Sequence, residues 1–154
     1  MELRFVGADS ADFRMLAQKL DEYYFELVGE VHLRYAAYNR PEALSCLAVV
    51  YEDGRAVACG AWKAVDEVTA EIKRIYVLPA FRRRGAARML IGALEEHAAA
   101  SGCHRALLET ARTTEDSAAL YRSLGYREMP YYGSPAGAEN CRCFEKEISD
   151  GTMR

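Results

Sequence analysis

The sequence contains little proline and no long apolar run. Only 4 of its 154 residues are proline and its hydrophobic content of 51% is ordinary, which excludes collagen-like, fibrous and disordered chains. No apolar stretch approaches the roughly 20 residues that a membrane-spanning helix needs. Residues 1–5 also lack the basic start and the apolar stretch of a signal peptide. We therefore expect a soluble, cytoplasmic protein that does not bind a membrane.

Positive charge is not in excess, and neither cysteine nor histidine is spaced as in a metal site. Lys and Arg number 20 against 23 Asp and Glu, for a formal net charge of −3, whereas nucleic-acid-binding domains are usually basic. Cys141 and Cys143 stand two residues apart, which is the spacing of neither a redox Cys-x-x-Cys pair nor a usual zinc site. His32, His97 and His104 show no ligand spacing. We expect reduced cysteines, no metal and no nucleic-acid partner.

Apolar residues follow helical and strand periodicities in alternation along the chain. In the first helical stretch they recur at three- and four-residue steps, and Asp53-Gly54 between two apolar runs is a strong hairpin signal. The expected elements are a strand at 3–6, a helix at 9–29, strands at 47–51, 57–65 and 69–77, a helix at 86–101, a strand at 105–110, a helix at 117–124 and a strand at 141–148. This order predicts one α/β domain over residues 1–154, with an antiparallel meander followed by a right-handed crossover.

A loop between a strand and a helix carries the clearest chemical signal. The strand ends before Pro79, and three arginines and a glycine directly precede the helix that begins at Ala86: Arg82, Arg83, Arg84 and Gly85. A helix N-terminus offers free backbone N–H groups and a positive dipole end, and glycine lets the backbone approach a ligand closely. Neither Gly-x-Gly-x-x-Gly nor Gly-x-x-x-x-Gly-Lys-Ser/Thr is present. The pattern favours a phosphate site, and the alternative is a solvated basic surface.

The same loop resembles a family signature. Arg82-x-x-Gly85-x-Ala87 resembles the Arg/Gln-x-x-Gly-x-Gly/Ala motif of the GNAT superfamily of acyl-CoA-dependent N-acetyltransferases. Further on, residues 118–126 resemble the second signature of that family, a short helix with a Leu-Tyr pair that ends at Gly-Phe/Tyr. The two blocks lie at the separation typical of the family, and the resemblance covers residues 47–148.

The resemblance implies a GNAT-like α/β fold with a central mixed, mostly antiparallel sheet of about six to seven strands flanked by helices. A splayed pair of strands would form the cleft for acetyl-CoA, the acetyl donor. The first strand of the pair would bind the pantetheine arm as an added strand does, and the amides of the loop would hold the pyrophosphate. The cofactor-binding residues implied in this way are Ile75, Tyr76, Val77, Arg82, Arg83, Arg84, Gly85, Ala86, Ala87, Arg88, Thr114 and Tyr121. Thr114 is a departure, because many relatives have asparagine there.

Acetyl transfer to an amine needs a proton acceptor, because a free alkyl amine has a pKa of about 10. Two carboxylates are candidates for this general base: Glu71 on the strand before the loop and Glu109 at the end of the facing strand. Ordered water is a third possibility, and either glutamate can be an ordinary surface residue. By resemblance, Tyr121 is the catalytic tyrosine that gives a proton to the thiolate of CoA; otherwise it packs in the core beside Leu120.

The sequence constrains the acceptor less than the donor. Four acidic residues crowd the first helix, where they either attract a cationic amine or form a solvated face: Asp21, Glu22, Glu26 and Glu30. Four tyrosines nearby either wall the acceptor pocket or pack: Tyr23, Tyr24, Tyr35 and Tyr38. We expect direct transfer to a primary amine of a small molecule, peptide or protein, by a monomer or a homodimer.

Two other functions are open. A non-catalytic CoA-binding or sensing domain on the same fold would keep the loop but would need no base or acid. A nucleic-acid module would use Arg82, Arg83, Arg84 and Arg88, and it should show aromatic residues among a broad basic face. Only Phe81 lies beside these arginines.

Overall fold

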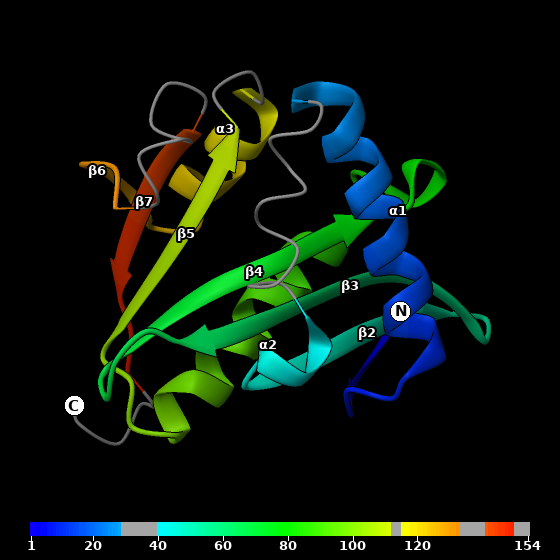
Figure 1. Ribbon diagram of the computed structural model, residues 1–154, viewed down its shortest axis with the longest axis horizontal. Coiled ribbons are helices and arrows are strands. Elements are labelled where there is room, and N and C mark those ends of the chain that lie inside the picture. Colours follow the sequence, from blue (N-terminus) through cyan, green and yellow to red (C-terminus); the bar gives the residue numbers. More distant parts are fainter. Residues whose placement is uncertain (29–39, 112–114, 133–140, 150–154) are drawn as a thin grey trace.

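The computed structural model describes residues 1–28, 40–111, 115–132 and 141–149 (Figure 1). The helices and strands are β1 (Glu2–Val6), α1 (Ala11–Val28), β2 (Cys46–Glu52), β3 (Arg55–Ala64), β4 (Thr69–Val77), α2 (Ala86–Ala100), β5 (Arg105–Ala111), α3 (Glu115–Ser123), β6 (Arg127–Met129) and β7 (Cys141–Glu147). Two 3-10 turns, η2 (Pro41–Ala43) and η3 (Pro79–Phe81), begin at prolines. The α/β order predicted from the periodicity is confirmed.

The seven strands join one sheet in the order β1-β2-β3-β4-β5-β7-β6. Every neighbouring pair is antiparallel except β4 and β5, which are parallel and are connected through α2. Asp53 and Gly54 form the turn between β2 and β3 with φ values of 51° and 80°. Two successive positive φ values are what a type I′ hairpin requires. The predicted mixed, mostly antiparallel sheet and its hairpin are therefore confirmed.

Helices cover both faces of the sheet. Figure 1 shows α1 crossing in front of the sheet while α2 lies behind it, and both helices contact β2, β3 and β4. Phe13 and Leu16 of α1 and Leu90, Ile91 and Leu94 of α2 are at most 1% exposed. Their three- and four-residue spacing places them on one face of each helix, and burial of each contributes about 1.5–3 kcal/mol. The core thus has one apolar layer on each side of the sheet.

Most predicted boundaries agree with the structure to within two residues. The strand expected at 57–65 is Arg55–Ala64, and the helix expected at 117–124 is Glu115–Ser123. In the part of the chain that the structure describes, no helix is both long and apolar enough to cross a bilayer.

β4 and β5 pair only over their first halves. The pairs run from Thr69 with Arg105 to Ile72 with Leu108. Beyond them β4 continues along β3, β5 continues along β7, and the two strands diverge toward their carboxyl ends (Figure 1). The splayed strand pair that the family resemblance predicts is confirmed.

A bulge in β4 lies where the two strands separate. The register with β3 shifts between Cys59 and Ala61, so that Arg74 and Ile75 of β4 lie opposite Gly60 alone. Arg74 has a φ of 61°, a left-handed value that is uncommon for residues other than glycine. A Cβ at Gly60 would lie 2.5 Å from Cδ1 of Ile75, so the end of the Ile75 side chain would have to move to make room for it. A bulge bends the strand that carries it, and this one follows the last pair between β4 and β5 by two residues.

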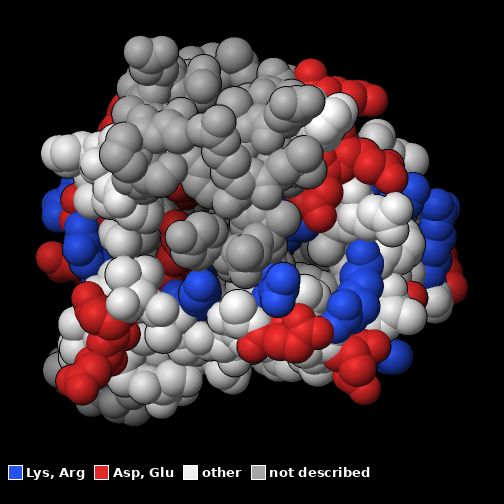
Figure 2. Space-filling view, in the orientation of Figure 1, with Lys and Arg blue, Asp and Glu red and all other residues white. Residues whose placement is uncertain are grey.

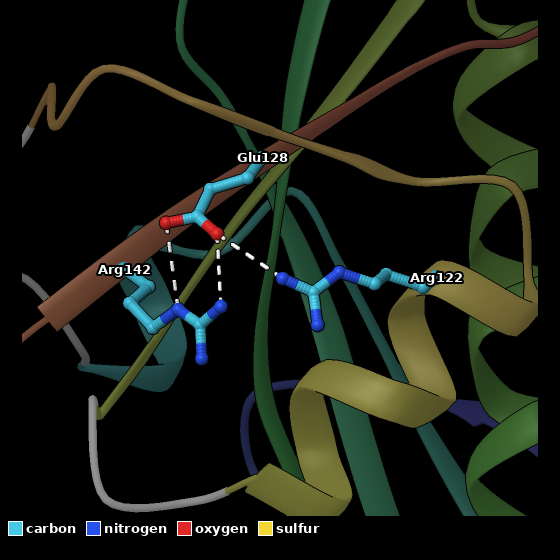
Figure 3. A network of polar contacts seen from close by, with 3 residues as sticks. All are labelled: Arg122, Glu128 and Arg142. Carbon is cyan, nitrogen blue, oxygen red and sulfur yellow. Dashed lines mark hydrogen bonds and ion pairs between the residues drawn. The ribbon is translucent and has the colours of Figure 1, made fainter.

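One carboxylate attaches α3 to the edge of the sheet. Glu128 of β6 lies between Arg142 of β7 and Arg122 of α3, as Figure 3 shows. Arg142 Nη2 and Arg122 Nη2 are 2.9 and 3.2 Å from Glu128 Oε1. Both guanidinium groups also lie over the ring of Phe144, at 5.8 and 5.7 Å from its centroid. These contacts connect α3, the helix that carries Tyr121, to β6 and β7.

Candidate functional site

An open cavity of about 870 Å³ lies where β4 and β5 separate. Its walls come from α1, the end of β4, the loop after it, the start of α2, the end of β5 and α3. Ten of the residues predicted to bind the cofactor line it: Ile75, Tyr76, Val77, Arg82, Arg83, Gly85, Ala86, Ala87, Arg88 and Tyr121. Thr114, another predicted contact, lies outside the described residues. The cavity has the volume of a typical small-molecule site.

The start of α2 presents free backbone N–H groups to this cavity. Gly85 caps the helix with a φ of 88°, and the first helical hydrogen bond runs from the Met89 N–H to the Gly85 carbonyl at 2.9 Å. The N–H groups of Ala86, Ala87 and Arg88 precede that bond and are therefore unpaired within the helix. A Cβ added at Gly85 would meet no atom within 4 Å, so the positive φ and not crowding requires glycine there.

Two of the loop arginines stay beside the end of β4. Arg82 donates from Nε to the carbonyl of Val77 at 3.0 Å, and its guanidinium lies 5.8 Å from the ring centroid of Tyr76. Arg83 has a φ of 65° and is exposed. Both line the cavity and add positive charge next to the helix N-terminus.

The other two arginines make contacts with neighbouring elements. Arg84 Nη1 is 3.0 Å from Glu52 Oε2, and its guanidinium lies over the ring of Phe81, so its side chain is directed to β2 and does not line the cavity. Arg88 donates to the Ser123 hydroxyl at 3.1 Å and thereby connects α2 to α3. Of the four arginines predicted to bind the cofactor, three therefore line the cavity: Arg82, Arg83 and Arg88.

The end of β4 forms the opposite wall. Tyr76 and Val77 pair with Cys59 and Ala58 on β3 along one edge of the strand. Because β4 has already separated from β5, the other edge faces the cavity, where Ile75 also contributes to the lining. A strand edge of this kind can pair with an extended ligand.

Tyr121 borders the cavity and also packs into the core. The residue is 9% exposed, and its ring contacts Tyr126 and Phe144 edge-on at centroid distances of 6.3 and 5.9 Å. Burial, with a smaller electrostatic effect of Tyr24, raises the pKa of the Tyr121 hydroxyl. The phenol therefore stays protonated at neutral pH and is able to donate a hydrogen bond. The geometry fits both the packing role and the proton-donor role.

Glu71 lies on the paired part of β4 and is not in the wall of this cavity. The Tyr132 hydroxyl donates to Glu71 Oε2 at 2.7 Å, and Lys73 Nζ is 3.3 Å from Oε1. The side chains of Glu71 and Lys73 are 14% and 20% exposed. Glu71 is level with Leu107 of the parallel strand β5, so Glu109, two residues later, projects from the same face of the sheet.

Glu109 is half-buried, and its environment changes its proton affinity. Burial raises the pKa of Glu109, and the negative charge of Glu71 raises it further. Hydrogen bonds with Cys141 and Tyr131 and the positive charge of Lys73 lower the pKa in opposition. The result is a pKa above the usual value for glutamate, which suits a proton acceptor that must work near neutral pH. The structure thus brings the two predicted carboxylates together.

The acidic residues of α1 differ in their surroundings. Asp21 Oδ1 accepts a hydrogen bond from Arg74 Nη2 at 2.9 Å, whereas Glu22 and Glu26 are exposed. Glu30 lies outside the described residues, as do Tyr35 and Tyr38 among the tyrosines expected at the acceptor site. The other two tyrosines expected there, Tyr23 and Tyr24, line the cavity.

Sequence reasoning missed several residues of this region. Thr110, Asp116 and Ser117 line the cavity, and Tyr131 and Tyr132 contact the two candidate bases. Thr110 could have been found, because it ends a predicted strand that faces the cleft. The two tyrosines follow β6 in a segment without periodicity, so no sequence pattern indicated their contacts.

Charges of both signs are interspersed over the described part of the face in Figure 2. A broad basic face, as a nucleic-acid module would need, is not seen on that part of the surface. Among the described residues, no group of three or more His, Cys, Asp or Glu side chains could hold a metal ion.

Comparison with known proteins agrees with this geometry. The family model described as "Acetyltransferase (GNAT) family" matches residues 13–126. A protein of Escherichia coli strain K12, described as the uncharacterized N-acetyltransferase YjgM, is 34% identical over 71 residues. That match spans 46% of this chain and 42% of the relative, less than half of either.

Solved structures share the fold over almost the whole chain. The crystal structure of a presumed acyl-CoA N-acyltransferase from Klebsiella pneumoniae has a TM-score of 0.75 and 26% identity, and covers 96% of this chain and 97% of that one. An N-acetyltransferase from Thermoplasma acidophilum, solved in complex with coenzyme A, has a TM-score of 0.71 at 14% identity and covers 96% of this chain and 100% of its own.

Proposed function

The chain belongs to the acetyltransferase (GNAT) family, and we propose that it transfers the acetyl group of acetyl-CoA to a primary amine in the cleft between β4 and β5. One observation carries this proposal. The cavity has on one side the edge of β4 that no longer pairs with β5, and on the other a helix N-terminus that has no side-chain cap and is flanked by arginines. These are the two features that an extended pantetheine arm and a pyrophosphate require.

The residues present fit acetyl-CoA. The space next to Gly85 is open, and the N–H groups of Ala86, Ala87 and Arg88 are available to phosphate oxygens beside the side chain of Arg83. Arg84 would contribute through its backbone, because its side chain is engaged by Glu52. Thr114 is retained as a proposed contact from the sequence.

When bound, acetyl-CoA supplies a thioester whose carbonyl carbon an amine can attack. The acceptor is an ammonium at neutral pH, and Glu71 or Glu109 takes its proton, directly or through water. Tyr121, protonated and next to the cavity, donates to the sulfur that leaves. Members of this family act on amine acceptors, and we propose a primary amine of a small molecule, a peptide or a protein for this chain.

A screen of acceptors tests the proposed function. Acetyl-CoA is mixed with the protein and a panel of amines that includes a polyamine, an amino acid, an aminoglycoside and a peptide with a free N-terminus, and thiol release is measured. We expect CoA release that depends on at least one amine. Tight CoA binding without amine-dependent release from any acceptor would indicate the non-catalytic CoA-binding domain instead.

A further inference from the structure

Two adjacent tyrosines after β6 reach the two candidate bases. The Tyr132 hydroxyl donates to Oε2 of Glu71 at 2.7 Å, across 61 positions of sequence. The neighbouring Tyr131 makes a side-chain hydrogen bond with Glu109. Both tyrosines are half-buried. The segment that follows β6 therefore contributes one phenol to each carboxylate.

The two carboxylates differ in how they are held. Glu71 has the Tyr132 hydroxyl on one oxygen and Lys73 Nζ 3.3 Å from the other, so that two donors fix its orientation. Glu109 is half-buried, and burial and the charge of Glu71 both raise its pKa. A carboxylate with fixed orientation is suited to a charge-assisted hydrogen bond with an ammonium. A carboxylate with a raised pKa is the better proton acceptor near neutral pH.

Titratable groups face Glu109 from four parts of the chain. They are Glu71 and Lys73 of β4, Cys141 and Cys143 of β7, Tyr131 and Tyr132 after β6, and Tyr24 of α1. Burial raises the pKa of Tyr24 to about 12 and also raises the pKa of Tyr132, so that both phenols are neutral at pH 7. Among these groups, Glu71 supplies the negative charge next to Glu109 and Lys73 supplies the positive charge.

We propose that Tyr132 is a positioning residue, which holds the carboxylate of Glu71 in place to bind the acceptor ammonium while Glu109 takes the proton. This inference rests on the proposed function. The ammonium gives one proton to Glu109, which passes it to solvent. The neutral nitrogen then bonds to the acetyl carbon and the carbon–sulfur bond breaks. Tyr121 gives its proton to the sulfur. The second proton that the nitrogen loses then restores the Tyr121 hydroxyl.

The variant Tyr132→Phe tests the role of Tyr132, since it removes only the hydroxyl. We expect KM for the amine to rise about tenfold, which corresponds to about 1.4 kcal/mol, because Glu71 loses a charge-assisted hydrogen bond. The value of kcat and the affinity for acetyl-CoA should stay close to those of the wild type.

The matched variant Tyr131→Phe removes the neighbouring hydroxyl, which contacts the other carboxylate. It should leave KM for the amine unchanged and move the acid limb of the pH–rate profile to higher pH. The hydrogen bond with Tyr131 lowers the pKa of Glu109, so its loss should raise that pKa. Glu71→Gln should raise KM for the amine and move the limb to lower pH, because Glu109 loses a neighbouring negative charge. Glu109→Gln should remove the limb and lower kcat about a hundredfold.

Carboxyl ¹³C NMR of the ligand-free protein provides a readout that does not depend on activity. The titration midpoint of Glu109 should fall in Glu71→Gln and rise in Tyr131→Phe. An unchanged midpoint in Glu71→Gln would overturn the inference. So would loss of the acid limb in Glu71→Gln, or a Tyr132→Phe variant with unaltered KM for the amine. If the wild type releases no CoA with any amine, the proposed function fails, and the NMR titration still decides whether the two carboxylates interact.

Discussion

Replacing Gly85 by valine tests the cofactor site through backbone conformation. Gly85 has a φ of 88°, and a Cβ there would meet no atom within 4 Å, so crowding by the protein does not enter. A branched residue at positive φ costs about 1–3 kcal/mol, which the loop can relieve by moving to negative φ. That movement rotates the N–H groups of Ala86 and Ala87 away from a bound pyrophosphate. We expect CoA affinity to fall at least about tenfold, which corresponds to about 1.4 kcal/mol.

Further substitutions at Gly85 show whether backbone strain at positive φ causes the loss of CoA affinity. Gly85→Asn should retain most of the affinity, because asparagine tolerates the left-handed region, and Gly85→Ala should lie between Asn and Val. The control is Gly92→Ala on the same helix, where a Cβ also meets no atom within 4 Å. It should stabilise the protein by about 0.5–1 kcal/mol and leave CoA binding unchanged.

Titration calorimetry measures the affinity of each variant for CoA, and thermal melting measures its stability. Wild-type CoA affinity in Gly85→Val would refute the placement of the pyrophosphate at this helix N-terminus. If the Asn and Val variants lost the same CoA affinity, the positive φ would not be the reason that glycine is needed at this position.

Three further predictions concern single side chains. Tyr121→Phe should lower turnover about ten- to a thousandfold with little change in Tm, as expected for loss of one general acid, and full activity in steady-state kinetics would return the residue to a packing role. Because burial raises the folded-state pKa of Glu109, its stabilising contribution is present below the unfolded pKa and is lost as pH rises through the folded pKa. Glu109→Gln should therefore melt at a higher temperature than the wild type at pH 7 and at nearly the same temperature near pH 4; an equal difference at both pH values would contradict this. Asp21→Ala should destabilise the fold by about 1–3 kcal/mol in urea unfolding, because Arg74 is 7% exposed and loses a charged partner; an unchanged midpoint would show that this ion pair contributes nothing.

Much of the fold follows from local patterns in the sequence. The Asp53-Gly54 turn has the two positive φ values that its residues favour, and the helical spacing from Phe13 onward defines the buried face of α1. The splay of β4 and β5 is different, because apolar periodicity does not specify where two parallel strands stop pairing. It was predicted from the family resemblance alone.

Parts of the site could not be predicted, for two physical reasons. The positive φ at Arg74 could not be predicted, because arginine rarely adopts a left-handed conformation. The sequence pattern therefore predicted a regular strand at the position of the bulge. Side-chain direction in a loop depends on distant partners. Glu52 draws Arg84 away from the cavity, and the contact of Tyr132 with Glu71 spans 61 positions.

The products of the reaction test the central claim most directly. Acetyl-CoA labelled with ¹³C in the acetyl group is incubated with the protein and a primary amine found active in the screen, and both products are quantified by mass spectrometry. The account predicts equal amounts of labelled N-acetylated amine and free CoA, and neither product above background in protein-free controls. CoA released at the same rate without the amine, with no labelled amide, would contradict it, because the protein would then hydrolyse the thioester and not transfer the acetyl group.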